Sequence, residues 1–297
     1  MSLLPRCDGR QPRQRIFMTM GTCLASGLMV LTTPTVAAEA PPLKDLLRKA
    51  GEHIVTLQTQ LDVTIAQEDY SQVSWPSRAR RRIVSDVAWV PTGDAMVWAF
   101  FRDVVSVDGA PVTDRQARLE QLFFSGATHA ARQQAARLLE EGARYNLGIP
   151  RTVNTPIFCL AVLHPENQDR FRFNAAGEKR VDLQHLQKIR FSEVRRPTLT
   201  RTSIGADVPS QGLLLVERES GALVECELEL QVPGVSSAWL RVRYHPQGRQ
   251  MVWLPVEMRE EYSYPVGRDR NETVEGIAKY SSFRSAQVEL QRLQVIK

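Results

Sequence analysis

The chain has little of what metal binding and common catalytic motifs require. Its 297 residues include only four cysteines and five histidines, and no CxxC, HExxH or HxH spacing is present to suggest a zinc site. It also lacks a GxSxG elbow, a P-loop and a GxGxxG between a strand and a helix. These absences predict no metal and no cofactor. They disfavour an enzyme without excluding one, because catalytic triads are recognised by geometry.

A long uninterrupted apolar run is missing as well. Four arginines at positions 6, 10, 13 and 15 precede the run IFMTMGTCLASGLMVLTT, which is followed by TPTVAAEA. This layout is typical of a secretory signal cleaved after Ala38. Gly21, Ser26 and Gly27 interrupt the run, which makes retention as a membrane anchor the weaker alternative. We expect residues 1–38 to be a cleaved signal and the protein to be periplasmic or secreted, with no transmembrane span afterwards.

The charge balance gives no indication of a nucleic-acid partner. Without the leader's four arginines and Asp8, the chain holds 34 basic and 32 acidic residues, against 38 and 33 for the whole sequence. A net charge of about +2 does not require an anionic partner. The dense basic run RARRR at 78–82 precedes an apolar, strand-like segment, and we interpret it as protection of an edge strand against aggregation rather than as a binding patch.

Two cysteines, Cys159 and Cys226, remain after the leader. In an oxidising compartment they could form one disulfide bond. Each lies in an apolar run, PIFCLAVL or VECELEL, so two buried free thiols are an equally good interpretation.

Hydrophobic periodicity predicts helices first and a large antiparallel sheet afterwards. Leucines, Ala50 and Ile54 recur at steps of three and four over residues 43–61, as in an amphipathic helix. Strands are expected over 81–90 and 94–107, with a turn at Asp108-Gly109. A helical block at about 112–165 follows, ending in the all-apolar helix 157–163, which we expect to be buried.

From about residue 169 onward the chain alternates as strands do. Two strands flank Ser220-Gly221, with Val224, Cys226, Leu228 and Leu230 on one face, and two more flank the HPQGR turn. Such alternation predicts an antiparallel sheet with one buried face. The stretch IAKYSSFRSAQVELQRL at 277–293 predicts a late, kinked strand with Val288 and Leu290 on one face. Residues 39–297 are therefore expected to form one α+β domain: a curved, largely antiparallel sheet, as in an open half-barrel, with helices on or inside its concave face.

Aromatic side chains are the candidate ligand-binding residues. Large aromatics on the inner face of a curved sheet can line an apolar cavity for acyl chains, although each also fits an ordinary core position. The predicted set is Trp89, Trp98, Phe100, Phe158 and Trp253.

Polar candidates lie in LHPENQDRFRF. His164, Glu166 and Asp169 could form a general-base or ligand cluster. The alternative is a helix C-terminus that His164 stabilises and Pro165 ends.

The order of an amphipathic helix, antiparallel strands and an alternating C-terminal meander resembles that of the outer-membrane lipoprotein-sorting (LolA/LolB-like) carriers, mainly over 40–70 and 170–297. That resemblance implies an open, curved sheet around helices and a hollow for lipid acyl chains, and no carrier residue maps onto a position here. The stretches VWAFFRDVVSVDGAPVTDR, ARYNLGIPRTVNTP, LHPENQDRFRF and EMREEY…GIAKYSSFR are also similar to those of uncharacterised exported proteins of Acidobacteria-type bacteria.

Three functions remain open at this point. The first is a periplasmic or cell-envelope binding protein that holds an apolar or lipid-like ligand, such as lipoprotein acyl chains. The second is an envelope structural or interaction module, partnered by another envelope protein, whose hollow is filled by its own helices. The third is a hydrolase that uses His164 and Glu166.

Overall fold

The computed structural model describes residues 42–60, 64–91, 98–113, 140–151, 154–182, 184–202, 204–248 and 251–285. The expected leader and residues 114–139 of the predicted helical block lie outside these residues. So do Val288 and Leu290.

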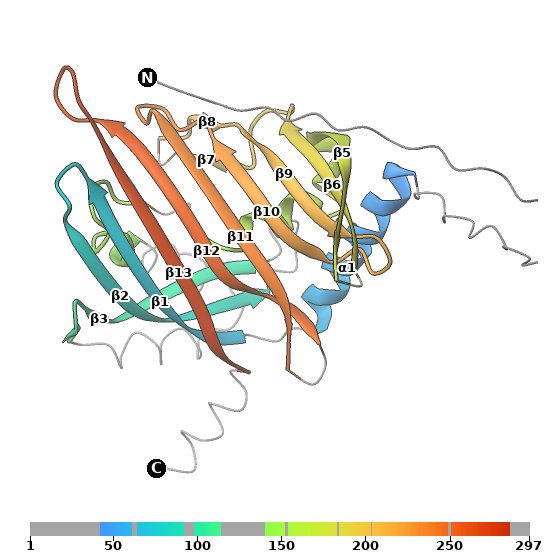
Figure 1. Cartoon of the computed structure of the whole chain (residues 1–297), viewed down its shortest axis with the longest axis horizontal. Helices are drawn as coiled ribbons and strands as arrows, with labels where there is room; N and C mark the ends of the chain where they lie inside the picture. The colour runs from blue at the N-terminus through green and yellow to red at the C-terminus, as the bar shows by residue number, and fades with distance from the viewer. Residues whose placement is uncertain are drawn as a thin grey trace, which may run out of the picture. The chain divides into compact units, whose positions relative to one another are not determined.

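One antiparallel sheet of eleven strands dominates the fold (Figure 1). Its spatial order is β4-β3-β2-β1-β13-β12-β11-β10-β9-β6-β5, so β4 and β5 are the edges and the sheet is not closed. The strands, in chain order, are β1 (Thr64–Trp75), β2 (Arg80–Pro91), β3 (Trp98–Val107), β4 (Ala110–Pro111), β5 (Phe171–Val181), β6 (Gln184–Glu193), β9 (Ser210–Glu217), β10 (Leu223–Leu230), β11 (Ser237–Gln247), β12 (Val252–Pro265) and β13 (Asn271–Ser285). A separate two-stranded hairpin consists of β7 (Thr200–Arg201) and β8 (Asp207–Val208).

Two helices pack against one face of this sheet. The amphipathic helix α1 (Leu43–Gln60) buries Leu46, Ala50, Ile54 and Leu57, as its periodicity predicts. The short helix α4 (Phe158–Leu163) is followed by the 3-10 turn η1 (Gln168–Arg170). Five of the six residues of α4 are buried, and they share one hydrophobic core with α1 and the inner faces of the strands. The expected α+β class, with an open, curved antiparallel sheet and helices on one face, is confirmed.

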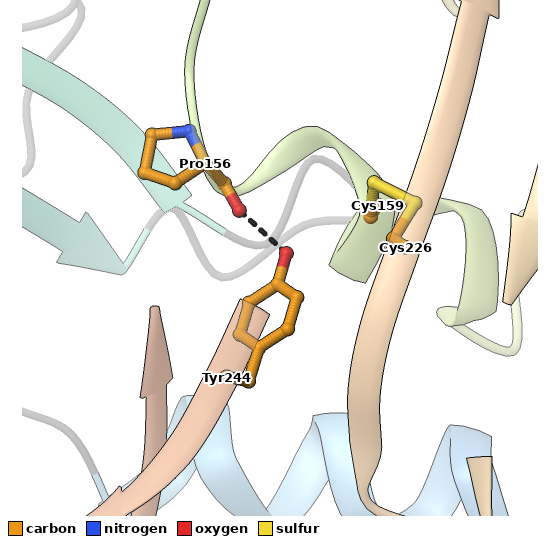
Figure 2. The surroundings of a disulfide bond; sticks show 4 residues. All are labelled: Pro156, Cys159, Cys226 and Tyr244. Atoms are coloured by element: carbon orange, nitrogen blue, oxygen red, sulfur yellow. Dashed lines mark hydrogen bonds between the residues drawn. A yellow bond between two sulfur atoms is a disulfide. The ribbon is translucent and has the colours of Figure 1, made fainter. Parts of the chain in front are cut away.

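A disulfide bond joins Cys159 of α4 to Cys226 of β10 (Figure 2). Both residues are buried. Close by, the hydroxyl of Tyr244 on β11 donates a hydrogen bond of 2.6 Å to the carbonyl oxygen of Pro156, just before α4. The bond settles the choice between a disulfide and two free thiols, and it fixes α4 against the sheet covalently.

The observed strands correct two details of the sequence interpretation. Strand β2 lies between β1 and β3, so the view that the 78–82 arginines protect an edge strand is wrong. In β10 the pairing shifts between Leu223 and Glu225. This bulge turns Leu223 inward in place of Val224, while Cys226, Leu228 and Leu230 face the core as predicted.

The C-terminal stretch is a kinked strand, as predicted. The β1–β13 pairing shifts between Ile65↔Arg284 and Gln67↔Ser281. Ser282 has a positive φ of 56° at this point. The strand therefore bends within the YSSFR segment.

Among the described residues, no helix combines the length and apolar character needed to cross a membrane.

Candidate functional site

Strand β1 places three polar side chains in the protein interior. Glu68, Tyr70 and Gln72 alternate along the strand and are 0%, 0% and 1% exposed. Alternate residues of a strand share a face, so all three point toward the core side of the sheet. Burying such groups is costly unless each finds a partner, and the surrounding elements provide those partners.

The first partner is Arg102 on β3. Its Nε and Nη2 atoms lie 2.6 and 2.8 Å from the two carboxylate oxygens of Glu68, a bidentate pair with the guanidinium 2% exposed. The same guanidinium donates to the side-chain and main-chain oxygens of Asn154 and lies 5.3 Å from the ring centre of Phe100. Burial lowers the pKa of Arg102, but the charge and hydrogen bonds of Glu68 outweigh it, and the net pKa is raised.

The second partner is Arg151, from the segment that precedes α4. Its guanidinium lies 3.1 Å from Glu260 of β12, and both side chains are at most 1% exposed. A guanidinium has five N–H donors, and all five are used here. They bond to Glu260, Tyr70, Gln72 and the carbonyl oxygens of Leu147 and Ile149.

A glycine on the intervening strand makes this contact possible. Strand β13 lies between β1 and β12, and Tyr70 reaches across it to donate a hydrogen bond to Glu260. A Cβ atom at Gly276 would lie 2.7 Å from a ring carbon of Tyr70 and 2.9 Å from the Cγ of Glu260. Such distances are too short for a methyl group, so the space left by Gly276 is occupied by the tyrosine.

Buried tyrosines complete the network. Burial, reinforced by the charge of Glu260, raises the pKa of Tyr70 and of Tyr262, and burial with the charge of Glu68 does the same for Tyr280. These hydroxyls therefore stay protonated at neutral pH. Two polar atoms of the network, Tyr262 Oη and Glu260 Oε2, have no hydrogen-bond partner within the described part of the chain.

A cavity of about 330 Å³ adjoins the network. Arg151 and Tyr262 belong to both, and the guanidinium carbon lies 5.0 Å from the ring centre of Tyr262. The remaining wall combines apolar side chains with threonine hydroxyls and the charged residues Glu140 and Arg201. It is formed by Glu140, Ile149, Pro150, Thr200, Arg201, Thr202, Val208, Val232 and Val235.

The charged groups of the network are engaged with one another. The buried carboxylates each face an arginine or a tyrosine, and the network contains no serine, cysteine or histidine nucleophile. In the described ranges, no three His, Cys, Asp or Glu side chains come close enough to hold a metal ion. Among the residues that line the cavity, Arg151 and Tyr262 are buried, and they form its polar floor.

Four of the five aromatic residues predicted from the sequence are described, and they lie elsewhere. Trp89 and Phe100 are 3% and 5% exposed, with ring centres 6.0 Å apart, and Trp89 also contacts the rings of Tyr280 and Phe283. Phe158 and Trp253 are partly buried against the core. Trp98 begins β3, but its side chain is outside the described residues. The structure brings Trp89 and Phe100 together and places neither in the wall of the cavity.

His164 and Glu166 do not share a site. His164 is 6% exposed at the end of α4, and its Nδ1 accepts a hydrogen bond of 3.4 Å from the main-chain N–H of Glu166. The Glu166 side chain is exposed, and Asp169 forms an ion pair with Arg195. This arrangement matches the helix-terminus interpretation of the segment.

Sequence reasoning missed the residues of the network. Strand β1 has the sequence TIAQEDYSQVSW, in which polar residues occupy both faces, so it gives no apolar alternation to detect. On β12 a signal existed: Glu260 and Tyr262 continue the inward phase of Met258 at steps of two. A charged residue in phase with a buried face indicates a buried partner of opposite charge.

Comparisons with known proteins yield distant structural likenesses. A LolA-superfamily protein from Nitrosomonas europaea is 10% identical over 82% of this chain and 92% of its own, with a TM-score of 0.31. An outer membrane lipoprotein-sorting protein domain from Vibrio parahaemolyticus is 9% identical over 80% and 92%, with a TM-score of 0.35. A DUF1329-family protein from Desulfovibrio piger is 8% identical over 82% and 93%, with a TM-score of 0.37. No protein-family model and no curated protein matches the chain. Likeness at these TM-scores carries no argument about what this chain binds, which has to come from its own residues.

Proposed function

We propose that the protein is a periplasmic or cell-envelope binding protein that holds an apolar or lipid-like ligand in the cavity beside Tyr262. The observation that carries this proposal is the cavity itself, with an apolar wall that includes Val208, Val232 and Val235 and a buried polar floor. Its volume of about 330 Å³ lies at the lower end of the range for small-molecule sites, which begins at about 300 Å³. Such a volume suits one acyl chain or a segment of one.

The floor of the cavity restricts the polar part of the ligand. Every N–H donor of Arg151 already has a protein acceptor, so a ligand anion would gain no free donor there. The Tyr262 hydroxyl oxygen is itself buried below the surface of the wall, so it offers no donor to a ligand either. We therefore propose a ligand whose body is uncharged and mainly apolar. Burial of that body would supply about 25 cal/mol per Å².

Export to the cell envelope is supported by two separate features. The first 38 residues have the layout of a secretory signal. The disulfide between Cys159 and Cys226 is typical of proteins that fold in an oxidising compartment.

A second candidate function is favoured by a specific observation. Helices α1 and α4 already pack into the core side of the sheet, and α4 is fixed there by the disulfide. A sheet filled in this way suits an envelope interaction module without a ligand, and that function is the alternative to the carrier proposal.

Titration with decanol, observed by saturation-transfer NMR, separates the two candidates. The carrier proposal predicts saturable binding to the wild type and loss of binding in Val235→Trp, because the indole fills the cavity. Val181→Trp is the matched control: Val181 is 37% exposed, lies in the β5–β6 hairpin and does not border the cavity. Absence of binding to the wild type, or equal binding to both variants, would reject the cavity as a ligand site.

A further inference from the structure

The arginines at 78–82 belong neither to the buried network nor to the wall of the cavity. They form one dense basic run in the sequence. They do not protect an edge strand, because β2 is an inner strand of the sheet. Arg81 and Arg82 form ion pairs with Asp108 and Asp69. Arg78 and Arg80 are exposed and have no acidic partner within the described residues.

A second turn brings similar residues to the same end of the sheet. Strand β1 pairs with β13 so that Trp75 lies opposite Thr273, which places the β1–β2 turn beside the β12–β13 turn (Figure 1). The second turn, residues 266–270, closes with a hydrogen bond from the N–H of Val266 to the carbonyl of Arg270. Arg268 and Arg270 in it are exposed and likewise lack an acidic partner in the described ranges.

We define the two-turn tip as residues 75–80 and 265–270. It holds four arginines against one aspartate, Asp269. The nearby Glu272 accepts a hydrogen bond from Ser74. Glu261 of β12 and Glu275 of β13, which lie opposite each other, are each four residues farther from the turn. The tip is therefore a local concentration of positive charge on a chain that is otherwise almost neutral.

The tip also exposes large apolar side chains. Trp75 and Val266 are each 41% exposed, although a soluble surface gains nothing from an exposed indole. Tryptophan prefers the interface between water and lipid, and arginines near a membrane surface are attracted by anionic head groups.

From this combination we propose that the two-turn tip docks on an anionic phospholipid surface, with Trp75 and Val266 entering the interface and the four arginines contacting head groups. The docking does not depend on a ligand in the cavity. The β10–β11 loop, which supplies Val232 and Val235 to the cavity wall, lies at the same end, since Ser237 pairs with Ser263 close to the β12–β13 turn. Docking would thus bring the cavity to the lipid surface.

Vesicle co-sedimentation tests the proposal. The mature protein is mixed at low salt with vesicles of phosphatidylglycerol and phosphatidylethanolamine, or of phosphatidylcholine alone. The wild type should bind the anionic vesicles selectively, and added salt should weaken the binding. Each arginine near an anionic surface is worth about a factor of five in partitioning, so the variant Arg78→Gln/Arg80→Gln/Arg268→Gln/Arg270→Gln should bind up to about 600-fold more weakly. Trp75→Ala should weaken binding without changing its salt dependence.

A control variant removes the same kind of charge at the opposite end of the sheet. Lys179 and Arg180 are exposed in the β5–β6 hairpin beside Val181, and Lys179→Gln/Arg180→Gln should bind as the wild type does. Equal binding to both vesicle types, no binding to either, or unchanged binding by the four-arginine variant would overturn the proposal. If vesicle binding is absent and a photocrosslinker at position 268 captures an envelope protein in cells, the tip docks on a protein and the membrane proposal is overturned. The Val235→Trp variant, whose cavity is filled, should bind vesicles as the wild type does. Its vesicle binding therefore tests membrane docking independently of whether the cavity holds a ligand.

Discussion

Removal of the disulfide bond gives the sharpest test of how the interior of the fold is held. Cys159 and Cys226 are 1% and 0% exposed, and the bond links the helix α4 to the inner strand β10 (Figure 2). The change is Cys159→Ala/Cys226→Ala, which removes the crosslink and leaves no free thiol. Alanine fits both positions because each side chain is already buried among apolar neighbours.

The expected loss follows from the size of the loop that the bond closes. The two cysteines are 67 residues apart, and the chain-entropy relation gives about 4 kcal/mol for a loop of that length at 25 °C. A typical domain is stable by about 5–15 kcal/mol. The disulfide therefore contributes a large fraction of the free energy of unfolding.

Guanidinium denaturation, followed by circular dichroism, measures this loss. Tyr244→Phe is the matched control, because it removes the hydrogen bond to Pro156 at the same junction and keeps the crosslink. That variant should lose about 1–3 kcal/mol, the cost of leaving one buried carbonyl unsatisfied. If the free energy of unfolding of the double alanine variant lies within about 1 kcal/mol of the wild-type value, the entropic reasoning does not apply. Helix α4 is then held by packing alone.

Three other predictions concern the buried network and the helix α1. Gly276→Ala should lower the free energy of unfolding by about 1–3 kcal/mol through overpacking, since its methyl group meets Tyr70 and Glu260; an unchanged denaturation midpoint would show that the network has room to move. Arg102→Met should lower the free energy of unfolding by about 3–5 kcal/mol, because it leaves Glu68 buried and unpaired. Adding Glu68→Leu should recover part of that loss. A double variant no more stable than Arg102→Met would contradict the ion-pair argument. Burial lowers the pKa of His53 below 6.5 despite the opposing effect of Glu217, so the unfolded chain takes up the proton more readily. The stability from the neutral imidazole is therefore complete above about pH 6.5 and falls as the pH drops toward the folded-state pKa. Melting temperatures at pH 7 and 5 should differ less in His53→Leu than in the wild type, and an equal difference would exclude His53 as the source.

The sequence was sufficient to predict buried positions where one face of a helix or strand is uniformly apolar. The periodicity of α1 identified its buried residues, and the alternation in β9 to β12 identified the hairpins and most inward positions. The edge-strand interpretation of the 78–82 arginines failed because periodicity shows which face a residue occupies but not which strand is its neighbour. The prediction that Val224 faces the core failed for a related reason. A local shift in strand pairing changes which residues face the core without changing the composition of the strand.

The candidate site was harder to predict because its residues break the rule that identifies buried positions. Glu68 and Gln72 are polar and fully buried, and they are tolerated only because arginines from segments distant in sequence reach them. Pairing between residues 68 and 102, or 151 and 260, is a property of the folded sheet. Only the phase of Glu260 relative to Met258 hinted at it in the sequence.

The central claim is that an apolar ligand occupies the cavity beside Tyr262. Native mass spectrometry of the mature protein purified from its own envelope, followed by organic extraction and lipid analysis, tests it most directly. The account predicts a reproducible added mass that organic solvent releases as a lipid-like molecule and that Val235→Trp lacks. A spectrum with only the ligand-free mass, reproduced under gentle purification, would contradict the claim and favour the interaction module.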